Sequence, residues 1–171
     1  MITILKASIE EATIIVDIGK KSLVESHGSS APTSDIEFYI SNTYNLDKIK
    51  AELSNKENVY HIIYYKGQAA GYSKIIFDSV HPNINTGNVT KLDRLYLLKE
   101  FYDLKLGLKL FEFNKELSKK SNQAGMWLYT WVGNQRAINF YKKLGFEIIG
   151  KADFKISEHH SNPNYQMYLK Y

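Results

Sequence analysis

The chain has 171 residues, of which 44% are hydrophobic and 23% are charged, a balance that is ordinary for a globular domain and excludes a disordered or fibrous protein. Its net charge of +4 comes from 22 basic and 18 acidic residues, and the basic residues are dispersed, which argues against a nucleic-acid-binding arm. The sequence has no cysteine and no apolar run near the roughly 20 residues of a membrane helix, which excludes disulfides, thiolate metal sites, a cysteine nucleophile and a membrane span.

The N-terminal third predicts a strand followed by three helices. Residues 2–7 alternate as a strand does, and the N-terminus lacks the basic start and apolar stretch of a secretory signal, so we expect a cytoplasmic protein. A Ser-x-x-Glu capping pattern predicts a helix over 8–23, and small, turn-forming residues predict a loop over 25–34. A second capping pattern, Ser34 with Glu37, predicts a short helix, and Asn45 is suited to cap another one.

The middle of the chain predicts three strands. Two runs of β-branched and aromatic residues, 59–65 and 69–77, are separated by Lys66-Gly67-Gln68, a spacing typical of a β-hairpin with glycine in the turn. Turn-forming residues over 82–88 predict a loop, and 89–97 predicts the next strand.

The last part predicts two helices and three strands. Four apolar residues recur at helical spacing and predict a helix that ends near Lys120. They are Leu106, Leu110, Phe113 and Leu117. A strand over 126–132 precedes a second helix, and 146–149 and 166–171 predict two final strands with a polar loop between them. No repeat or linker divides the chain, so we expect one α/β domain over 1–171, with a mixed, mostly antiparallel sheet of six to seven strands flanked by about four helices.

The segment from Leu92 to Phe113 passes from a strand through a short loop into the start of a helix. Backbone N–H groups at a helix start, reinforced by the helix dipole, are suited to bind a pyrophosphate, and glycine lets the backbone come close. Only Gly107 supplies such freedom here, so an ordinary strand-to-helix connection is the alternative.

The segment from Thr130 to Gly150 places Asn134 at the end of a strand and Tyr141 seven residues later. Seven residues are about two helical turns, so these two side chains share a helix face. A tyrosine on the apolar side of a short helix is also commonly a core residue, which is the alternative reading.

Both segments resemble one known family. LYLLKEFYDLKLGLKL is similar to the acetyl-CoA-binding strand-loop-helix of the GNAT acetyltransferases, and NQRAINFYKKLGF resembles their second signature, N-x-x-A-x-x-F-Y-x-x-x-G-F. The likeness extends over most of the chain, including the hairpin that contains AAGYSKI. The segments ELSN, AGY and DRLY resemble the bacterial spermidine/spermine acetyltransferase branch of that family.

The resemblance implies that acetyl-CoA is the co-substrate. It implies that backbone amides of seven consecutive residues cradle the pyrophosphate. These residues are Tyr102, Asp103, Leu104, Lys105, Leu106, Gly107 and Leu108. The pantetheine arm would pair with Tyr96 and Leu97, Asn134 would bind pantetheine or pyrophosphate, and Arg136 would bind a phosphate. The first signature departs from its usual form, because Lys105 removes a glycine that positive φ could require.

The resemblance also implies that Tyr141 is the general acid, which donates a hydrogen bond to the departing CoA sulfur. A general base must deprotonate the acceptor ammonium, and Asp93 is the candidate carboxylate, although a salt-bridged strand aspartate is the alternative reading. Lys91 stands where relatives often have a glutamate. His61 is a weaker candidate, in a strand where a packed histidine is the more common reading.

No metal site is predicted. His159 and His160 are adjacent, but neighbouring side chains on a strand point in opposite directions, and no third ligand is evident.

The predicted function is acetylation of a primary amine by direct attack in a ternary complex, without a covalent enzyme intermediate. A polyamine is the hypothesised acceptor, because ELSN, AGY and DRLY resemble the polyamine branch and because Glu25, Asp35 and Glu37 lie near the expected acceptor loop. The alternative is that these carboxylates are helix caps and solvated loop charges. Acetylation of a protein or peptide and a CoA-binding sensor without turnover are the alternatives. Exposed edges of the late strands are compatible with a homodimer.

Overall fold

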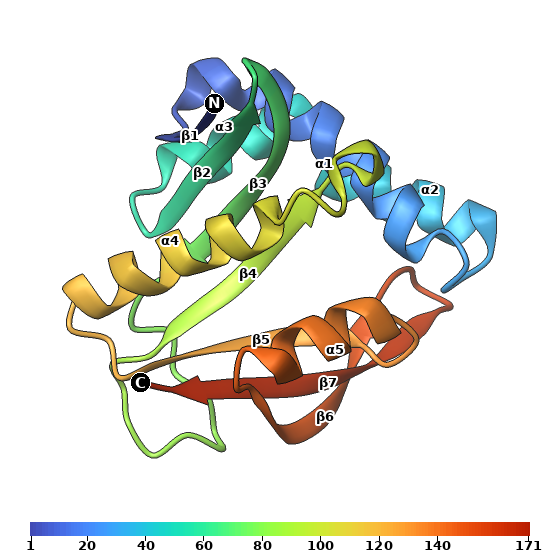
Figure 1. Cartoon of the computed structure of the whole chain (residues 1–171). Helices are drawn as coiled ribbons and strands as arrows, with labels where there is room; N and C mark the ends of the chain where they lie inside the picture. The colour runs from blue at the N-terminus through green and yellow to red at the C-terminus, as the bar shows by residue number, and fades with distance from the viewer.

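One seven-stranded sheet runs through the computed structural model, which describes all residues from Met1 to Tyr171. Its strands are β1 (Ile2–Lys6), β2 (Asn58–Tyr65), β3 (Gln68–Ile76), β4 (Thr90–Leu97), β5 (Gly125–Trp131), β6 (Glu147–Lys155) and β7 (Ser161–Lys170). The strand order is β1-β2-β3-β4-β5-β7-β6, and only β4 and β5 pair in parallel. The predicted mixed, mostly antiparallel sheet is confirmed (Figure 1).

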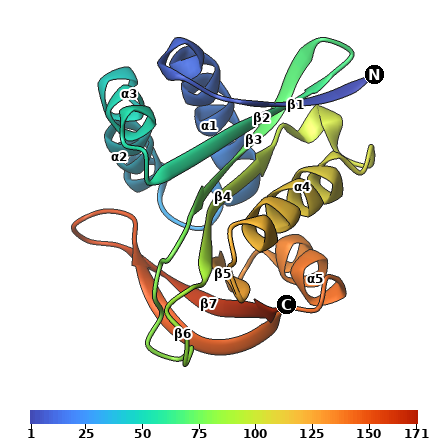
Figure 2. The same cartoon turned by 90° about the vertical axis from the view of Figure 1, so that its left-hand side faces the viewer.

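Five α-helices cover the two faces of this sheet. They are α1 (Ala12–His27), α2 (Thr33–Thr43), α3 (Leu46–Ser54), α4 (Leu106–Lys120) and α5 (Gln135–Lys143). Figure 2 shows α1, α2 and α3 on one side of the sheet and α4 and α5 on the other. No helix of the chain combines the length and the apolar character needed to cross a membrane.

The N-terminal capping patterns have different outcomes. Ser8 and Glu11 form the predicted capping box, which begins a 3-10 turn, and α1 then continues to His27, beyond the predicted end. The α2 helix has Pro32 at its N-cap, so the predicted Ser34 capping pattern is wrong. Proline suits a helix start because its φ is already helical and the first N–H groups need no partner within the helix.

The predicted loop between the last two strands is wrong in extent. The β6 strand continues to Lys155 and β7 begins at Ser161, so a short turn remains. Pro163 lies within β7, and its carbonyl accepts the Val132 N–H at 3.1 Å. The prediction failed because the segment is polar, although Asn162 and Asn164 are buried on one face of the strand.

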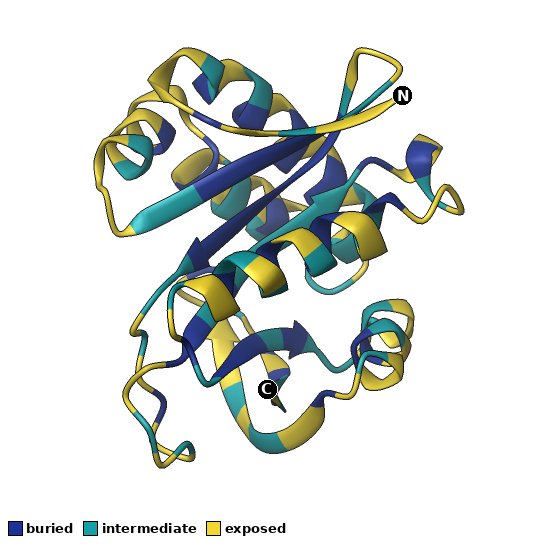
Figure 3. Cartoon of the chain, turned by 60° about the vertical axis from the view of Figure 1, so that its left-hand side comes forward, coloured by how far each residue is buried: buried dark blue, intermediate teal, exposed yellow.

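Two clusters of buried side chains form the core. One joins α1 and α3 to β2 and β3, and the other joins α4 and α5 to β5 and β7. Phe113 was expected on the buried side of α4 but is 37% exposed. The buried side of α4 instead includes Asn114, which donates to Ser73 Oγ at 2.8 Å, and Ser118, which lies 2.6 Å from Thr90 Oγ1. Figure 3 shows buried residues along the inner strands, whereas the β6 edge is mostly exposed.

A β-bulge in β4 positions the site. Lys74 of β3 pairs with Arg94 and Ile75 pairs with Leu92, which leaves Asp93 as the extra residue. A bulge bends its strand, and β4 pairs with β5 only at Thr90 and Lys91. Beyond Lys91 the two strands diverge, so the second half of β4 has one edge unpaired.

Candidate active site

Two cavities lie at the divergence of β4 and β5. The larger has a volume of about 790 Å³ and is lined by the end of α1, the end of β4 and the starts of α4 and α5. The smaller, of about 250 Å³, is lined by β4, β5, α2 and the ends of β6 and β7. Six residues line both: His27, Leu95, Tyr96, Asn134, Ala137 and Tyr141. The two cavities therefore meet at Asn134 and Tyr141, which come from one helix and its cap.

The loop before α4 has the positive φ angles that suit an anion site. These angles occur at residues other than Gly107. Asp103 and Lys105 have positive φ angles of 64° and 57°. Gly107 lies inside the first turn of α4, and a Cβ there would come within 3.2 Å of Leu97 Cδ1. The expectation that Gly107 supplies backbone freedom is therefore wrong. Its missing side chain instead allows α4 to pack closely on β4.

The free amides of this loop are fewer than the resemblance implies. The Tyr102 N–H donates to the Lys99 carbonyl at 3.1 Å, and the Leu104 N–H donates to the Tyr102 carbonyl at 2.8 Å. The N–H groups of Asp103 and Lys105 have no acceptor in the protein, and the first amides of a helix lack intrahelical acceptors, so those of Leu106, Gly107 and Leu108 also remain to bind an anion. The dipole of α4 adds partial positive charge at the same place.

The positive φ of Lys105 leads to a stability prediction. Lysine in a left-handed conformation is strained by roughly 1 kcal/mol relative to glycine. We expect Lys105→Gly to be more stable than Lys105→Ala by about 1 kcal/mol, because both variants lose the charge and only glycine relieves the strain. Urea unfolding of the two variants measures the difference, and equal midpoints and slopes would contradict it.

Basic side chains surround the larger cavity. The Arg136 guanidinium stacks on the Tyr102 ring, 3.5 Å from its centroid, which connects α5 to the loop before α4. Lys105 and Lys143 also line the cavity, as do Asp103 and Glu25. The Glu25 carboxylate accepts the Lys99 N–H at 2.8 Å.

The carboxylates expected around the acceptor lie elsewhere. Glu25 lines the larger cavity, and neither Asp35 nor Glu37 lines either of the two. The structure therefore brings none of these three to the smaller cavity.

Tyr141 lies at the junction of the two cavities. Its ring packs edge-on against Phe140 and Phe146, with centroid distances of 5.2 and 5.4 Å. Burial is the single cause that raises the pKa of the Tyr141 phenol above its usual value, with no contribution from a charged or hydrogen-bonding neighbour. The hydroxyl therefore stays protonated at neutral pH and is available as a donor. Asn134 caps α5 by accepting the Ala137 N–H at 3.1 Å, which leaves its amide NH₂ free to donate.

The smaller cavity has an aromatic wall and a charged floor. Its aromatic residues are Tyr39, Tyr96, Tyr129, Trp131, Tyr141 and Phe154. Its charged residues are Lys91, Asp93 and Arg94, all from the bulged part of β4.

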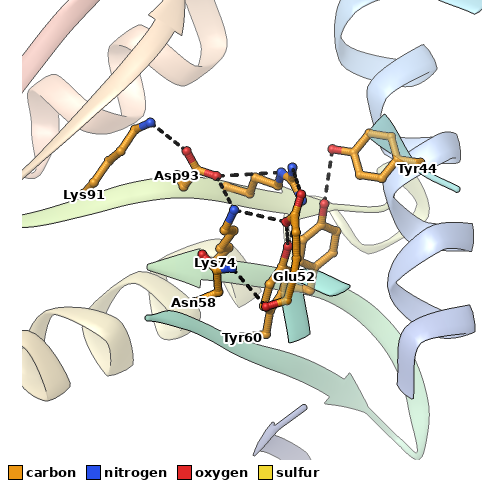
Figure 4. A network of polar contacts seen from close by, with 9 residues as sticks. Tyr44, Glu52, Asn58, Tyr60, Lys74, Lys91 and Asp93 are labelled. Carbon is orange, nitrogen blue, oxygen red and sulfur yellow. Dashed lines mark hydrogen bonds and ion pairs between the residues drawn. The ribbon is translucent and has the colours of Figure 1, made fainter. Parts of the chain in front are cut away.

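Asp93 is the centre of an ion-pair network (Figure 4). Lys91 Nζ lies 2.8 Å from its Oδ1, and Lys74 Nζ lies 3.1 Å from its Oδ2. Burial raises the pKa of the Asp93 carboxyl, but the cations Lys91, Lys74 and Arg94 outweigh this effect and lower it to about 2. Asp93 is therefore a salt-bridged strand aspartate, the alternative considered from the sequence. Its low pKa makes the carboxylate a weak base.

The loop between α1 and α2 is held against the start of β7 by two contacts, which the sequence did not indicate. Asn162 Nδ2 donates to Ser30 Oγ at 2.8 Å, and His160 Nε2 lies 3.1 Å from the Ser30 carbonyl oxygen. These contacts close one side of the smaller cavity, which Asn162 lines.

His27 is a site residue that sequence reasoning missed. It ends α1, lines both cavities and packs against Trp131 at a centroid distance of 5.8 Å. Burial lowers the pKa of its imidazole to about 4, so it is neutral at pH 7. Its position directly before the turn-forming Gly28 was the available signal, since helix ends often contribute to sites.

The other histidines line neither cavity. His61 is buried on β2 and packs edge-on against Phe113 at 4.8 Å, so the packed reading describes it. His159 and His160 lie in the turn between β6 and β7. No three His, Cys, Asp or Glu side chains are grouped so that they could hold a metal ion.

Comparison with known proteins identifies the family. The model of the acetyltransferase (GNAT) family matches residues 23–146, which include the loop before α4, the diverging strands and α5. The chain belongs to the GNAT family of acetyltransferases. It is an acetyl-CoA-dependent N-acetyltransferase, and both segments that carried the resemblance lie within the matched range.

Relatives and solved structures agree with this assignment. An uncharacterized N-acetyltransferase in the pepI 3′ region of Lactobacillus delbrueckii subsp. lactis is 26% identical over 157 residues, which cover 92% of this chain and 91% of that protein. The PaiA N-acetyltransferase from Thermoplasma acidophilum, solved in complex with coenzyme A, has a TM-score of 0.80 at 23% identity and covers 100% of this chain and 99% of its own. The ribosomal-protein-S18-alanine N-acetyltransferase from Escherichia coli has a TM-score of 0.72 at 15% identity, over 99% and 94% of the two chains.

Proposed function

We propose that this acetyltransferase moves the acetyl group of acetyl-CoA to the primary amine of a small acceptor by direct attack in a ternary complex. The observation that carries the proposal is the meeting of two cavities at Tyr141. One cavity would hold the cofactor and the other the acceptor, so that the amine and the thioester meet at their junction. Holding both reactants together supplies much of the rate by proximity.

The larger cavity fits acetyl-CoA by three independent features. Its volume of about 790 Å³ lies in the range of cofactor sites. Three free amides at the start of α4 and the cations Lys105 and Arg136 suit the phosphates. The unpaired edge of β4 at Tyr96 and Leu97 suits the amide groups of the pantetheine arm, which can pair with it as a strand would.

We assign the remaining contacts on the same basis. The free NH₂ of Asn134 would donate to pantetheine or pyrophosphate, and Arg136 would bind a phosphate from its stacked position on Tyr102. Bound acetyl-CoA supplies an activated acyl group as a thioester. Tyr141 would donate its hydroxyl proton to the departing sulfur.

The acceptor ammonium must lose a proton before it attacks, and Asp93 stays the proposed carboxylate partner for it. The low pKa of Asp93 makes it a poor acceptor of that proton. Its position on the cavity floor suits it better to attract and orient the ammonium group, from which water can remove the proton.

Two alternative acceptors can be compared with the smaller cavity. A polyamine would bring several ammonium groups to a cavity in which Asp93 is the one carboxylate. A protein N-terminus would need an open groove, whereas the smaller cavity measures about 250 Å³. The size of this cavity therefore favours a small molecule.

A turnover screen tests the proposal. Purified protein is first titrated with acetyl-CoA in a calorimeter, with a dissociation constant in the micromolar range expected. Release of CoA thiol is then followed with amino acids, polyamines, aminoglycosides and peptides. We expect binding together with amine-dependent thiol release. Binding without release for any amine would indicate a CoA sensor, and the absence of binding at about a millimolar would contradict the cofactor site.

A further inference from the structure

Five charged side chains form one cluster beneath the smaller cavity. They are Glu52, Lys74, Lys91, Asp93 and Arg94. Lys74 bridges the two carboxylates at 3.1 Å from each, and Arg94 NH1 lies 3.1 Å from Glu52 Oε2. Three cations therefore share two carboxylates, which leaves one positive charge in excess (Figure 4). Charges this far from solvent are normally balanced.

The unbalanced charge is most accessible at Lys91. The side chains of Lys74 and Arg94 are only 9% and 11% exposed. Arg94 directs NH1 and NH2 to Glu52, at 3.1 and 3.3 Å. Lys91 is 23% exposed, has Asp93 as its one carboxylate partner and lines the cavity. An ammonium group has three donors, so Lys91 can hold a second anion.

No other ionised group in the cavity offsets this excess. His27 is neutral because burial lowers the pKa of its ring to about 4. The remaining polar lining consists of tyrosine hydroxyls, Thr130, Trp131 and the amides of Asn134, Asn162 and Asn164. A polyamine would thus bring further positive charge to a cavity floor that already carries an excess of it.

We propose that the acceptor is a small amine that also carries a carboxylate, as a free amino acid does, with that carboxylate paired to Lys91. This inference rests on the proposed function of the site. The ammonium of such an acceptor would face Asp93, so its two charges match the Lys91–Asp93 pair, whose ions lie 2.8 Å apart. Lys91 lies where β4 still pairs with β5, whereas Tyr141 lies at the junction with the larger cavity. The carboxylate would therefore bind away from the junction and the amine toward the thioester.

Matched acceptors test the charge requirement without any mutation. Leucine and phenylalanine are each compared with the corresponding amide and with the amine that lacks the carboxyl group, and spermidine is included. We expect kcat/KM to be roughly 10-fold to 100-fold higher for the amino acids, the range for one hydrogen bond between charged groups. The wall of aromatic side chains predicts that both of these apolar amino acids fit better than glycine.

A variant then locates the carboxylate. Lys91→Gln should raise KM about 10-fold or more for the amino acid and leave that of its amide nearly unchanged. Lys91→Arg should restore much of the preference because it keeps the charge. The control is Lys50→Gln, an exposed lysine of α3 outside both cavities, which should behave as the parent with both acceptors.

The outcomes separate this inference from the proposed function. If the amides, the simple amines or spermidine react as well as the amino acids, or if Lys91→Gln slows amino acid and amide equally, the carboxylate assignment is wrong and acetyl transfer stands. If acetyl-CoA binds but no acceptor of any charge releases thiol, the proposed function fails, and the acceptor assignment fails with it.

Discussion

Replacing Tyr141 with phenylalanine is expected to slow acetyl transfer by roughly 10²-fold or more, the usual scale for losing one general acid. The substitution keeps the ring that packs on Phe140 and Phe146 and removes only the hydroxyl. Since burial already raises the pKa of this phenol, the parent donates its proton throughout the neutral range. Folding and acetyl-CoA affinity should therefore change little while the chemical step slows.

The pH dependence gives this prediction a second measurement. A thiol with a pKa near 8.5 leaves more easily without a proton as the pH approaches that value, so the effect of Tyr141→Phe should shrink between about pH 6 and about pH 9. Single-turnover rates at saturating acetyl-CoA measure it. Tyr64→Phe is the matched control, because Tyr64 lies on β2 and lines neither cavity. Equal rates for Tyr141→Phe and the parent across this range would make Tyr141 a packing residue only.

Glu52→Gln is expected to lower the free energy of unfolding by about 3 kcal/mol at pH 7, the scale for removing one partner of a buried ion pair. Glu52 accepts a hydrogen bond from Tyr60 OH, and Lys74 and Arg94 each lie 3.1 Å from its carboxylate. Glutamine keeps the size of the side chain but not its charge. It leaves Lys74 and Arg94 with Asp93 as their one remaining carboxylate partner.

The sign of the pH dependence follows from the direction of the pKa shift. Burial raises the pKa of the Glu52 carboxyl, but Arg94, the Tyr60 hydrogen bond and Lys74 outweigh it, so the pKa is lowered. A lowered pKa stabilises the fold above the unfolded-state pKa of about 4.3, and this contribution is lost as the pH falls further. The difference between parent and Glu52→Gln should therefore shrink below about pH 4. Urea unfolding measures both values, with Glu57→Gln as an exposed control, and equal stabilities at pH 7 would contradict the prediction.

Local features could be predicted wherever a few neighbouring residues determine them. The hairpin turn at Gly67 and the helix stop at Gly145 are confirmed, with positive φ angles of 83° and 95°. Asn45 caps α3 as expected, by accepting the Lys48 N–H at 2.9 Å. Predictions failed where tertiary packing overrides local preference. Phe113 follows the apolar spacing of α4, yet Asn114 is buried instead because Ser73 of β3 offers it a hydrogen-bond partner.

The sequence by itself determined the family and the cofactor, because both signatures are contiguous segments whose residue types and spacing carry the chemistry. Only the tertiary structure decided the acceptor side of the site. It brings His27 of α1, Asn162 of β7 and Lys91 of β4 to the walls of one cavity, although they are far apart in the sequence. The bulge that leaves Asp93 unpaired with β3 depends on the register between two strands, which no local pattern contains. The excess positive charge beneath the cavity likewise exists only because folding places three cations beside two carboxylates, a balance that the dispersed charges along the chain do not reveal.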